Sequence, residues 1–339
     1  MDETVLLGHG SGGTMMKRII DQVFYEAYGS DELLTGDDAA TLPLPAEGKL
    51  AFSTDSFVVT PHFFPGGDIG KLAVCGTVND VATSGAIPQY LSCGFILEEG
   101  FPIEDLKKIC ASMAEMAKEA GVKIVTGDTK VVNRGHGDGV FINTSGVGYI
   151  PKGVSLSGAS CKPGDKILLT GTLGDHGITI MSCREELSFS ADLKTDAAPL
   201  NHLIQEVLAV APNTRCFRDP TRGGLASTLN ELASQSQVDF EVEEESIPVK
   251  DAVYGACEML GYDVYQVANE GKMVCVVPAD QAQAALEAMK ANKYGIDAAI
   301  IGEVIEKPEN REPRVSIRTG FGALRIMDML VGQQLPRIC

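Results

Sequence analysis

Basic residues are scarce in this sequence. Its 339 residues include 28 Lys and Arg against 46 Asp and Glu, which gives a formal net charge of −18. A protein that binds the phosphate backbone of a nucleic acid needs clustered Lys and Arg. Docking on an anionic membrane surface needs the same kind of cluster. We therefore expect no nucleic acid and no membrane among the partners of this chain.

Long apolar runs and paired cysteines are also missing. No run is long enough to cross a bilayer, and the opening MDETVLLGHG has no basic stretch like that of a signal peptide. The nine cysteines include no Cys-x-x-Cys pair, which argues against a zinc ribbon or a thioredoxin-like site. Most lie in apolar surroundings, as in LAVCGT. This pattern predicts buried, reduced thiols in a cytoplasmic protein.

The length corresponds to about two domains. Strands and helices alternate in both halves, which favours α/β or α+β layers. The apolar patterns predict strands over 50–54, 91–97, 123–126, 141–150, 166–170, 272–277 and 299–304, and helices over 14–28, 70–84, 103–120, 174–183, 199–209, 223–234 and 280–291. We predict one domain over 1–152, a second over 153–331, and a mobile tail over 332–339, in which Pro336 stops any helix.

Four acidic positions stand beside Gly, Ser or Thr, in a setting that we interpret as strand ends. They are Asp38 in GDDAA, Asp55 in FSTD, Asp80 in VNDVA and Asp128 in VTGD. Magnesium prefers hard oxygen ligands and keeps water or phosphate oxygens in its shell. Taken together, the four positions favour a metal–phosphate site. Taken singly, each Asp could instead cap a helix or fix a turn.

Two glycine-containing segments could bind phosphate. The loop GHGSGG over residues 8–13 precedes a predicted helix that Thr14 could cap, and its backbone N–H groups could surround phosphates. A flexible turn is the alternative, and we expect His9 to be structural. The segment RDPTRGG over residues 218–224 places two arginines around an Asp. This arrangement suits phosphate or carboxylate recognition, or else a salt-bridged turn between domains.

Three further residues could carry chemistry. Lys130, next to the predicted site at Asp128, could neutralise a transferring phosphoryl group, and Glu270 at a Gly turn could act as a base. Cys339 stands last in the sequence, after Pro-Arg-Ile, where we expect an accessible thiol. Such a thiol can be acylated or alkylated, and a tail can move it between sites. Chance placement is one alternative. A prenylation signal is excluded, because it needs its Cys four residues from the end.

Together these motifs resemble the HypE family of hydrogenase maturation factors, the carbamoyl dehydratases of nickel–iron hydrogenase assembly. Several of them also occur in the wider superfamily of aminoimidazole ribonucleotide synthetase, selenophosphate synthetase and thiamine-monophosphate kinase. The terminal PRIC is what points to HypE. The resemblance runs from Gly8 to Cys339 and rests on GHGSGG, GDDAA, FSTDS, VNDVA, TGDTKVV, RDPTRGG, NEGK and PRIC.

The resemblance implies a two-domain, aminoimidazole ribonucleotide synthetase-like fold. The N-terminal α/β domain would pair with its copy in a homodimer, in which the two sheets join into a β-barrel. The C-terminal domain would be a layered α/β unit, with ATP in the cleft between domains. Gly10, Gly12 and Gly13 would close over the phosphates of ATP. The Mg²⁺ and ATP ligands would be Asp38, Asp55, Asp80 and Asp128.

The resemblance also implies a reaction and partners. A carbamoyltransferase, HypF, would place a carbamoyl group on Cys339, and ATP-dependent dehydration would convert it to an S-cyanate (thiocyanate). Lys130 would stabilise developing negative charge, and Glu270 would take a proton from the carboxamide nitrogen. The cyanide would then pass to iron on the HypC–HypD scaffold complex.

Two other functions compete with this interpretation. A small-molecule kinase or ligase resembling thiamine-monophosphate kinase would share the ATP features but would give Cys339 no role. A scaffold protein could use PRIC as a docking peptide, but it would have no need for the four acidic positions. Selenophosphate synthetase fits less well, because it needs a Cys or selenocysteine near the N-terminal loop and residues 1–20 contain none.

Overall fold

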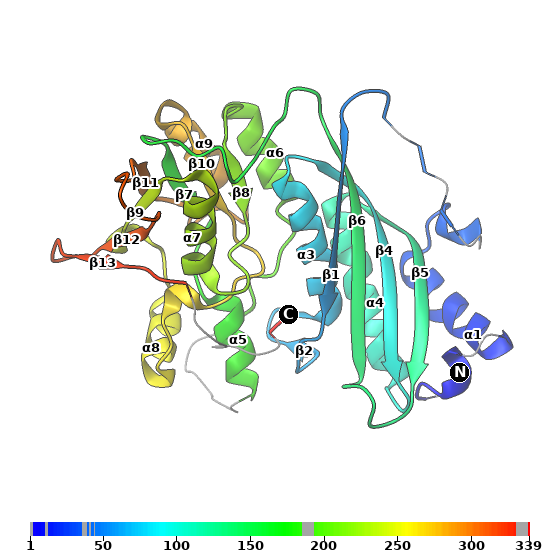
Figure 1. The fold of residues 1–339 in the computed structure, drawn as a ribbon. Coiled ribbons are helices and arrows are strands. Elements are labelled where there is room, and N and C mark those ends of the chain that lie inside the picture. The colour runs from blue at the N-terminus through cyan, green and yellow to red at the C-terminus, as the bar shows by residue number, and fades with distance from the viewer. Residues whose placement is uncertain are drawn as a thin grey trace.

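Two large β-sheets lie side by side, each with helices packed on it (Figure 1). A small third sheet pairs β2 Phe63–Phe64 with β3 Gly67–Asp68. All three sheets belong to one chain. They are seen in a computed structural model, which describes residues 3–10, 13–35, 39–40, 42–43, 45–184, 193–329 and 338–339. Strands between residues 49 and 150 build the first sheet, and strands between residues 166 and 326 build the second. Among the described helices, none combines the length and the apolar character needed to cross a membrane.

The first sheet has four strands in the order β1-β6-β4-β5. β6 pairs antiparallel with β1 and β4, whereas β5 runs parallel to β4. A parallel pair needs a crossover connection, which helix α4 supplies here. The strands are β1 Lys49–Phe57, β4 Ile87–Glu98, β5 Lys123–Val132 and β6 Val140–Ile150.

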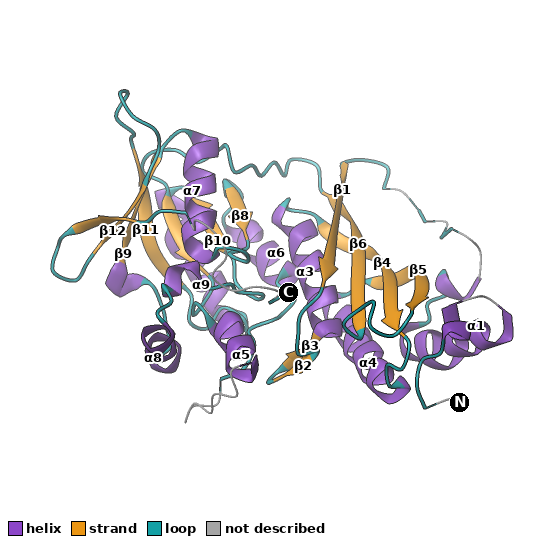
Figure 2. Ribbon diagram, turned by 60° about the horizontal axis from the view of Figure 1, so that its bottom comes forward, coloured by secondary structure: helices purple, strands orange, loops and turns teal. Residues whose placement is uncertain are grey.

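Helices pack on one face of this sheet, as Figure 2 shows for α3 and α4. α4 spans Ile103–Ala120 and buries positions 106, 109, 113, 116, 117 and 120 at helical spacing. It ends at Gly121, whose φ of 72° is the left-handed conformation that suits glycine. α3 spans Ile69–Thr83 and is buried along most of its length. The same face carries the N-terminal helical segment, made of α1 Gly13–Ile19, the π-turn η2 Ile20–Tyr25 and α2 Glu26–Tyr28.

The second sheet has seven strands in the order β13-β12-β9-β11-β7-β10-β8, and β7, β8 and β10 are buried on both faces, whereas β13 is exposed. On β10, Val274 and Val276 belong to the core under α7, while Cys275 and Val277 belong to the core under α6 and α9. The strands are β7 Lys166–Leu169, β8 Cys216–Arg218, β9 Asp239–Glu243, β10 Val274–Val277, β11 Ala299–Ile305, β12 Val315–Arg318 and β13 Leu324–Ile326. The helices are α5 Asp175–Arg184, α6 Asn201–Val210, α7 Gly224–Ser236, α8 Asp251–Leu260 and α9 Ala282–Ala291.

Most predicted elements are confirmed, the helix over 103–120 to the residue. The π-turn interrupts the helix predicted over 14–28, and Thr14 lies inside α1 rather than capping it. The prediction of strand-end acids is wrong at three positions. Asp55 and Asp128 lie inside strands, which extend further than predicted, and Asp80 lies inside α3. The first sheet is open, and the described residues form no barrel within one chain.

Glycine at position 70 allows α3 and α4 to approach closely. A Cβ placed there would lie 2.4 Å from the carbonyl oxygen of Ile109. Gly255, inside α8, has no atom within 4 Å of the same notional Cβ. We expect Gly70→Ala to lower the free energy of unfolding by about 1–3 kcal/mol through overpacking. Gly255→Ala should leave it unchanged or raise it by up to about 1 kcal/mol. Urea unfolding followed by circular dichroism checks both, and equal effects of the two variants would contradict this packing.

Candidate functional site

The end of the chain lies between the two sheets, beside β2 and α5, where C marks it in Figure 1. Ile338 is only 4% exposed and belongs to the core of the first sheet. Backbone N–H of Val58, just after β1, donates a hydrogen bond to the backbone oxygen of Cys339 at 3.0 Å. The expectation of an accessible thiol is therefore wrong for this position of the tail, because Cys339 is half-buried. Residues 330–337 lie outside the described part of the chain.

A cluster of acidic side chains lies beside this position, with Glu270 and Asp55 acting on Cys339 itself. Asp55 comes from β1, Asp80 from α3, Asp219 from the segment after β8, and Glu270 from the turn before β10. Burial, followed by the charge of Asp219, raises the pKa of Asp80 to about 6. Burial likewise raises the pKa values of Asp55 and Asp219. Because carboxylates gathered in a poorly solvated place repel one another, this cluster favours cations.

Positive charge near the cluster comes from Arg222 in RDPTRGG. It lowers the pKa values of Asp55, Asp80 and Asp219, but burial outweighs it at each one. Of the two interpretations of this motif, phosphate or carboxylate recognition and a salt-bridged turn, the position beside Cys339 favours recognition.

Glu270 is the most deeply buried member of the cluster, at 4% exposed. Burial and then the charges of Asp219 and Asp196 raise its pKa far above the ordinary value. Its backbone N–H donates to Asp196 Oδ1 at 3.0 Å. The next residue must be glycine, because a Cβ at Gly271 would lie 1.8 Å from the carbonyl oxygen of Asp196. A carboxyl with a raised pKa is protonated while no cation is bound, and a nearby cation lowers its pKa so that the ionised group can accept a proton.

The Cys339 thiol is protonated where it sits. Burial, together with the negative charges of Glu270 and Asp55, raises its pKa to about 12, and Arg222 opposes this shift. A thiol in this state is a poor nucleophile. We call the position of Ile338 and Cys339 between the two sheets the seat of the chain end. A thiol in this seat suits chemistry on a group that is already attached to the sulfur, rather than the attachment itself.

The other predicted residues lie elsewhere in the chain. Asp128 and Lys130 form an ion pair on β5, with Nζ 2.5 Å and 2.7 Å from the two carboxylate oxygens. Lys130 lowers the pKa of Asp128, and both side chains are more than half exposed. Gly10 packs against β5, where a Cβ would lie 2.6 Å from the backbone nitrogen of Val131. Gly13 begins α1, and Gly12 and Asp38 lie outside the described residues.

The predicted Asp set is not brought together within one chain. β1 and β5 are the two edges of the first sheet, so about 14 Å separates the backbones of Asp55 and Asp128. They also face opposite sides. Asp55 Oδ2 points to α3, near Gly76, whereas Asp128 aligns across the sheet with the exposed Ser56. The described residues hold no group of three or more His, Cys, Asp or Glu side chains placed to bind a metal ion.

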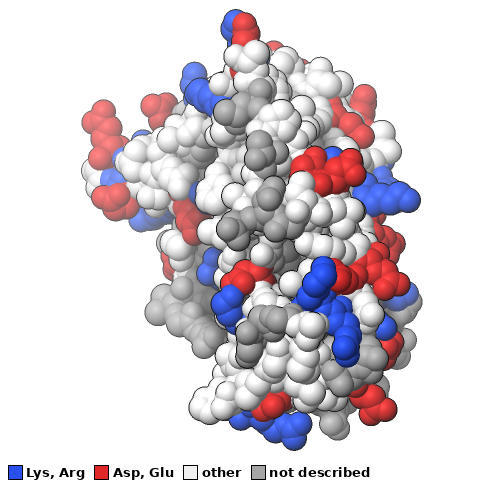
Figure 3. Space-filling model, turned by 90° about the vertical axis from the view of Figure 1, so that its right-hand side faces the viewer, with Lys and Arg blue, Asp and Glu red and all other residues white. Residues whose placement is uncertain are grey.

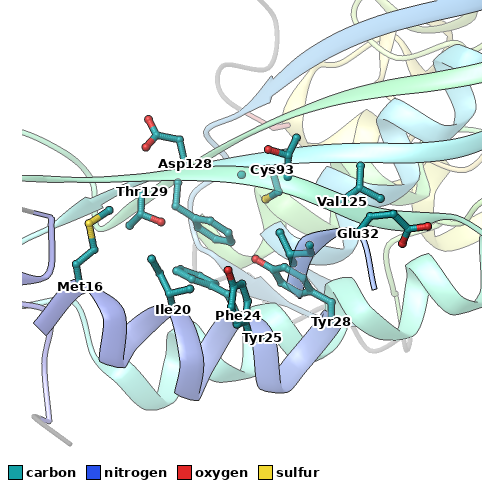
Figure 4. Close-up of a pocket in the computed structure, with 14 residues that line it drawn as sticks. Met16, Ile20, Phe24, Tyr25, Tyr28, Glu32, Cys93, Val125, Asp128 and Thr129 are labelled. Carbon is teal, nitrogen blue, oxygen red and sulfur yellow. The ribbon is translucent and has the colours of Figure 1, made fainter. Parts of the chain in front are cut away.

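A cavity of about 150 Å³ lies between the N-terminal helical segment and β5 (Figure 4). Aromatic side chains of Phe24, Tyr25 and Tyr28 line it from the helices, and Asp128 and Thr129 line it from the strand. A flat aromatic lining suits a planar ring. This cavity and the adjacent Gly10 loop form a second group of candidate binding residues, separate from the acidic cluster.

Comparison with known proteins decides the family. The chain matches the N-terminal domain model of AIR synthase related proteins over residues 36–150 and the C-terminal domain model over residues 162–312. It is 54% identical to carbamoyl dehydratase HypE of Azotobacter vinelandii over 336 residues, which cover 99% of this chain and 97% of that protein. It is 48% identical to carbamoyl dehydratase HypE of Escherichia coli K12, with 99% of each chain covered. This chain belongs to the HypE family.

Solved structures agree with the HypE assignment. The crystal structure of hydrogenase maturation protein HypE in complex with ATP has a TM-score of 0.95 and 49% identity, covering 99% of this chain and 100% of that chain. A HypE chain from a HypE–HypF complex has a TM-score of 0.81 and 51% identity, with coverages of 92% and 99%. Thiamine-monophosphate kinase from Stenotrophomonas maltophilia reaches a TM-score of 0.65 at 21% identity, which shows a shared fold alone.

Sequence patterns gave no signal for some residues at the site. His176 and Thr195 contact the chain end or each other, and Asp196 bonds the Glu270 turn. None of them lies in a motif that differs from ordinary loop or helix sequence. Asp219 lies inside RDPTRGG, and the arginines on either side of it are the signal that could have indicated it as a site residue.

The raised pKa of Asp80 predicts a stability effect in metal-free buffer. Between about pH 4 and 6 the folded chain binds this proton more tightly than the unfolded chain does, so stability falls as pH rises through that window. Asp80→Asn removes the charge and should raise the free energy of unfolding at neutral pH by about 1–3 kcal/mol, with no gain below about pH 4. Asp128→Asn is the matched control, and its lowered pKa predicts no gain. Urea unfolding across this pH range tests both variants, and a neutral-pH loss for Asp80→Asn would contradict the cluster electrostatics.

Proposed function

We propose that this chain uses ATP to dehydrate a carbamoyl group on its own Cys339 to an S-cyanate, the source of the cyanide ligand on the iron of nickel–iron hydrogenase. The observation that carries the proposal is the position of Cys339 between the acidic cluster and Arg222. Membership of the HypE family supports the same reaction.

The chemistry explains why these residue types are needed. An amide oxygen is a poor leaving group. Once ATP has phosphorylated it, the oxygen can leave as part of phosphate, which is a good leaving group. The C–O bond then breaks, phosphate leaves, and the two N–H protons are lost to give the nitrile. Glu270 takes a proton from the carboxamide nitrogen, because its charge acts on the Cys339 thiol more strongly than that of any other carboxylate.

The acidic cluster fits Mg²⁺. Its side chains are hard oxygen donors whose raised pKa values reflect mutual repulsion and burial, which a divalent cation would relieve. When bound, Mg²⁺ screens the negative charge of the ATP phosphates. Asp55, Asp80 and Asp219 alone are not placed to bind a metal ion, so they would contribute single ligands from this chain, and phosphate oxygens, water and the predicted Asp38 would complete the shell.

A homodimer completes the site. On the open face of the first sheet, Phe52 is 70% exposed and Leu50 is 55% exposed, and these apolar side chains need a cover. Asp128 and Lys130 lie on the same face. A second copy packed there would close the two sheets into the predicted barrel. Lys130, Asp128 and the Gly10 loop of one copy would then serve the acidic cluster of the other, with Lys130 stabilising developing negative charge.

The adenine of ATP belongs in the aromatic cavity beside Gly10. That loop packs on β5 next to the cavity, so phosphates leaving the cavity would pass its backbone N–H groups. Gly12 and Gly13 would extend the same contact. This placement refines the predicted cleft between domains, because each nucleotide would be shared by two chains.

Partners must reach the sulfur before and after the reaction. A solved HypE–HypF complex supports HypF as the carbamoyltransferase partner, and the HypC–HypD complex would receive the cyanide. Because Cys339 is half-buried in this position, both encounters require Ile338 and Cys339 to leave it. With the predicted domains 1–152 and 153–331, this position of Cys339 would lie at their junction. Seven of the nine cysteines are buried and all nine are unpaired, which fits a reducing, cytoplasmic compartment.

On the face seen in Figure 3, Lys and Arg stand among Asp and Glu rather than in one basic area. A small-molecule kinase is the remaining rival, and it would give the seated Cys339 no function.

Mass spectrometry of the peptide containing Cys339 tests the reaction. The protein is incubated with the carbamoyltransferase, carbamoyl phosphate and Mg²⁺-ATP, with a non-hydrolysable ATP analogue in parallel. We expect a carbamoyl adduct with the analogue and the same adduct minus one water with ATP. Glu270→Gln should keep the adduct and lose dehydration by about two orders of magnitude or more. An unmodified Cys339 in both samples, with an active transferase, would favour the kinase instead.

Mixed dimers test the shared site. Asp80→Asn and Asp128→Asn proteins, each inactive alone, are mixed and allowed to exchange subunits. After exchange, half of the dimers contain one chain of each variant. Each of these dimers has two sites, and one of them has both residues intact. About a quarter of the wild-type dehydration rate should therefore return. Two copies of the same variant give no return and serve as controls. If each chain held a whole site, mixing would restore nothing.

A further inference from the structure

Two hydrogen bonds from separate elements hold the last two residues. Val58 N–H donates to the Cys339 backbone oxygen, and His176 Nε2 lies 2.7 Å from the carbonyl oxygen of Ile338. Val58 follows β1 of the first sheet, whereas His176 lies on α5, which follows β7 of the second. The end of the chain is thus bonded to both halves of the molecule.

The bond from His176 has a defined direction. A carbonyl oxygen only accepts, so Nε2 carries the proton. His176 is fully buried, and burial lowers its pKa, so the ring is neutral and its other nitrogen is an acceptor. Thr195 Oγ1 lies 2.8 Å from that nitrogen and itself accepts the backbone N–H of Ala197 at 3.1 Å. The Thr195 hydroxyl therefore donates to Nδ1 and fixes the tautomer that donates to the chain end.

The same loop orders the acidic end of the site. Asp196, next to Thr195, accepts the backbone N–H of Glu270 and touches Gly271 closely. Phe64 packs edge-on against the His176 ring, with centroids 5.8 Å apart at 81°. The ring therefore has little freedom to turn, and the seat of the chain end is built on the loop that also fixes Glu270.

We propose that His176, oriented by Thr195, is a positioning residue that holds Ile338 and Cys339 in the seat where dehydration occurs and whose bond must break before Cys339 can meet the carbamoyltransferase. This deepens the proposed function and rests on it. His176 does not touch the reacting group. It acts through the backbone of Ile338, so its effect is on how long the chain end stays seated.

Matched amide variants separate the two nitrogens of the ring. Gln places its amide nitrogen near the position of Nε2, so His176→Gln keeps a donor to Ile338. Asn places its amide near Nδ1, so His176→Asn keeps the contact with Thr195 and loses the bond to the chain end. Loss of one buried hydrogen bond shifts the balance between seated and free ends by about five- to tenfold. His202→Gln, at an exposed position of α6, is the control, because His202 bonds the backbone of Glu119 and not the chain end.

The measurement is the rate at which iodoacetamide labels Cys339 in the full-length protein, located by peptide mass. We expect a rise of about five- to tenfold for His176→Asn, a rate within about twofold of wild type for His176→Gln, and no change for His202→Gln. Carbamoylation of Cys339 by the transferase should rise with labelling in His176→Asn. Fully buried Cys275 should remain unlabelled, which excludes general unfolding. Equal labelling of wild type and His176→Asn, or equal rises for Asn and Gln, would overturn the proposal.

A second variant tests the proposal if iodoacetamide also labels Cys275 in the His176→Asn protein, which would mean that this protein is partly unfolded. Thr195→Val keeps the shape of the side chain and removes the hydroxyl that fixes the tautomer. It should also raise labelling of Cys339 several-fold, and an unchanged rate would overturn the proposal. Failure of the proposed function would be seen in a different experiment. The carbamoyl adduct of the wild-type protein would then never lose water, whatever the labelling rates of the variants.

Discussion

The site depends on one buried side chain that joins α3 to the second half of the molecule. Asn79 donates to the carbonyl oxygen of Ala198 at 3.0 Å and accepts the N–H of Leu200 at 2.7 Å, and its amide also lies 3.5 Å from the Glu270 carbonyl oxygen. Asn79 stands one residue before Asp80 on the same helix. Any shift of α3 would therefore move the acidic cluster and the Glu270 turn apart. Such a fully bonded polar group in a core specifies one relative position of its neighbours.

This arrangement gathers charge at a cost to stability. Asp55, Asp80 and Asp219 all have raised pKa values, which means that the fold opposes their ionisation. An arrangement chosen for stability alone would have replaced at least one of them by a neutral residue. Their presence is the stability–activity trade-off expected of a site that binds a cation and a polyphosphate. The same crowding keeps Cys339 as a thiol and raises the pKa of Glu270, so one electrostatic feature acts on the acidic cluster, on the thiol and on the candidate base.

The local sequence pattern predicted the helices and strands. It could not predict the order of the strands in each sheet or which side chains lie together. The apolar spacing of α4 and its terminal Gly121 are visible in sequence, and the structure confirms them. Asp55 and Asp80 were predicted for the site, and they do lie together. Asp128 carried the same signal, yet it lies on the opposite face of the sheet, because strand order depends on long-range pairing that no local motif encodes. His176 gave no signal at all, since its role comes from a contact with a residue 162 positions away.

The interactions that hold Ile338 and Cys339 in the seat are weak enough for the chain end both to bind there and to leave. Burying the Ile338 side chain contributes about 2 kcal/mol, and each of the two backbone-directed hydrogen bonds adds about 1 kcal/mol. Ordering Ile338 and Cys339 costs about 1–2 kcal/mol for each backbone, before any side-chain entropy. These contributions nearly cancel, so small changes at the seat decide where the sulfur spends its time. On the proposed function, a carbamoyl group on Cys339 would add an amide inside the seat and a bound nucleotide would add cations beside it, and each would favour the seated chain end over the free one.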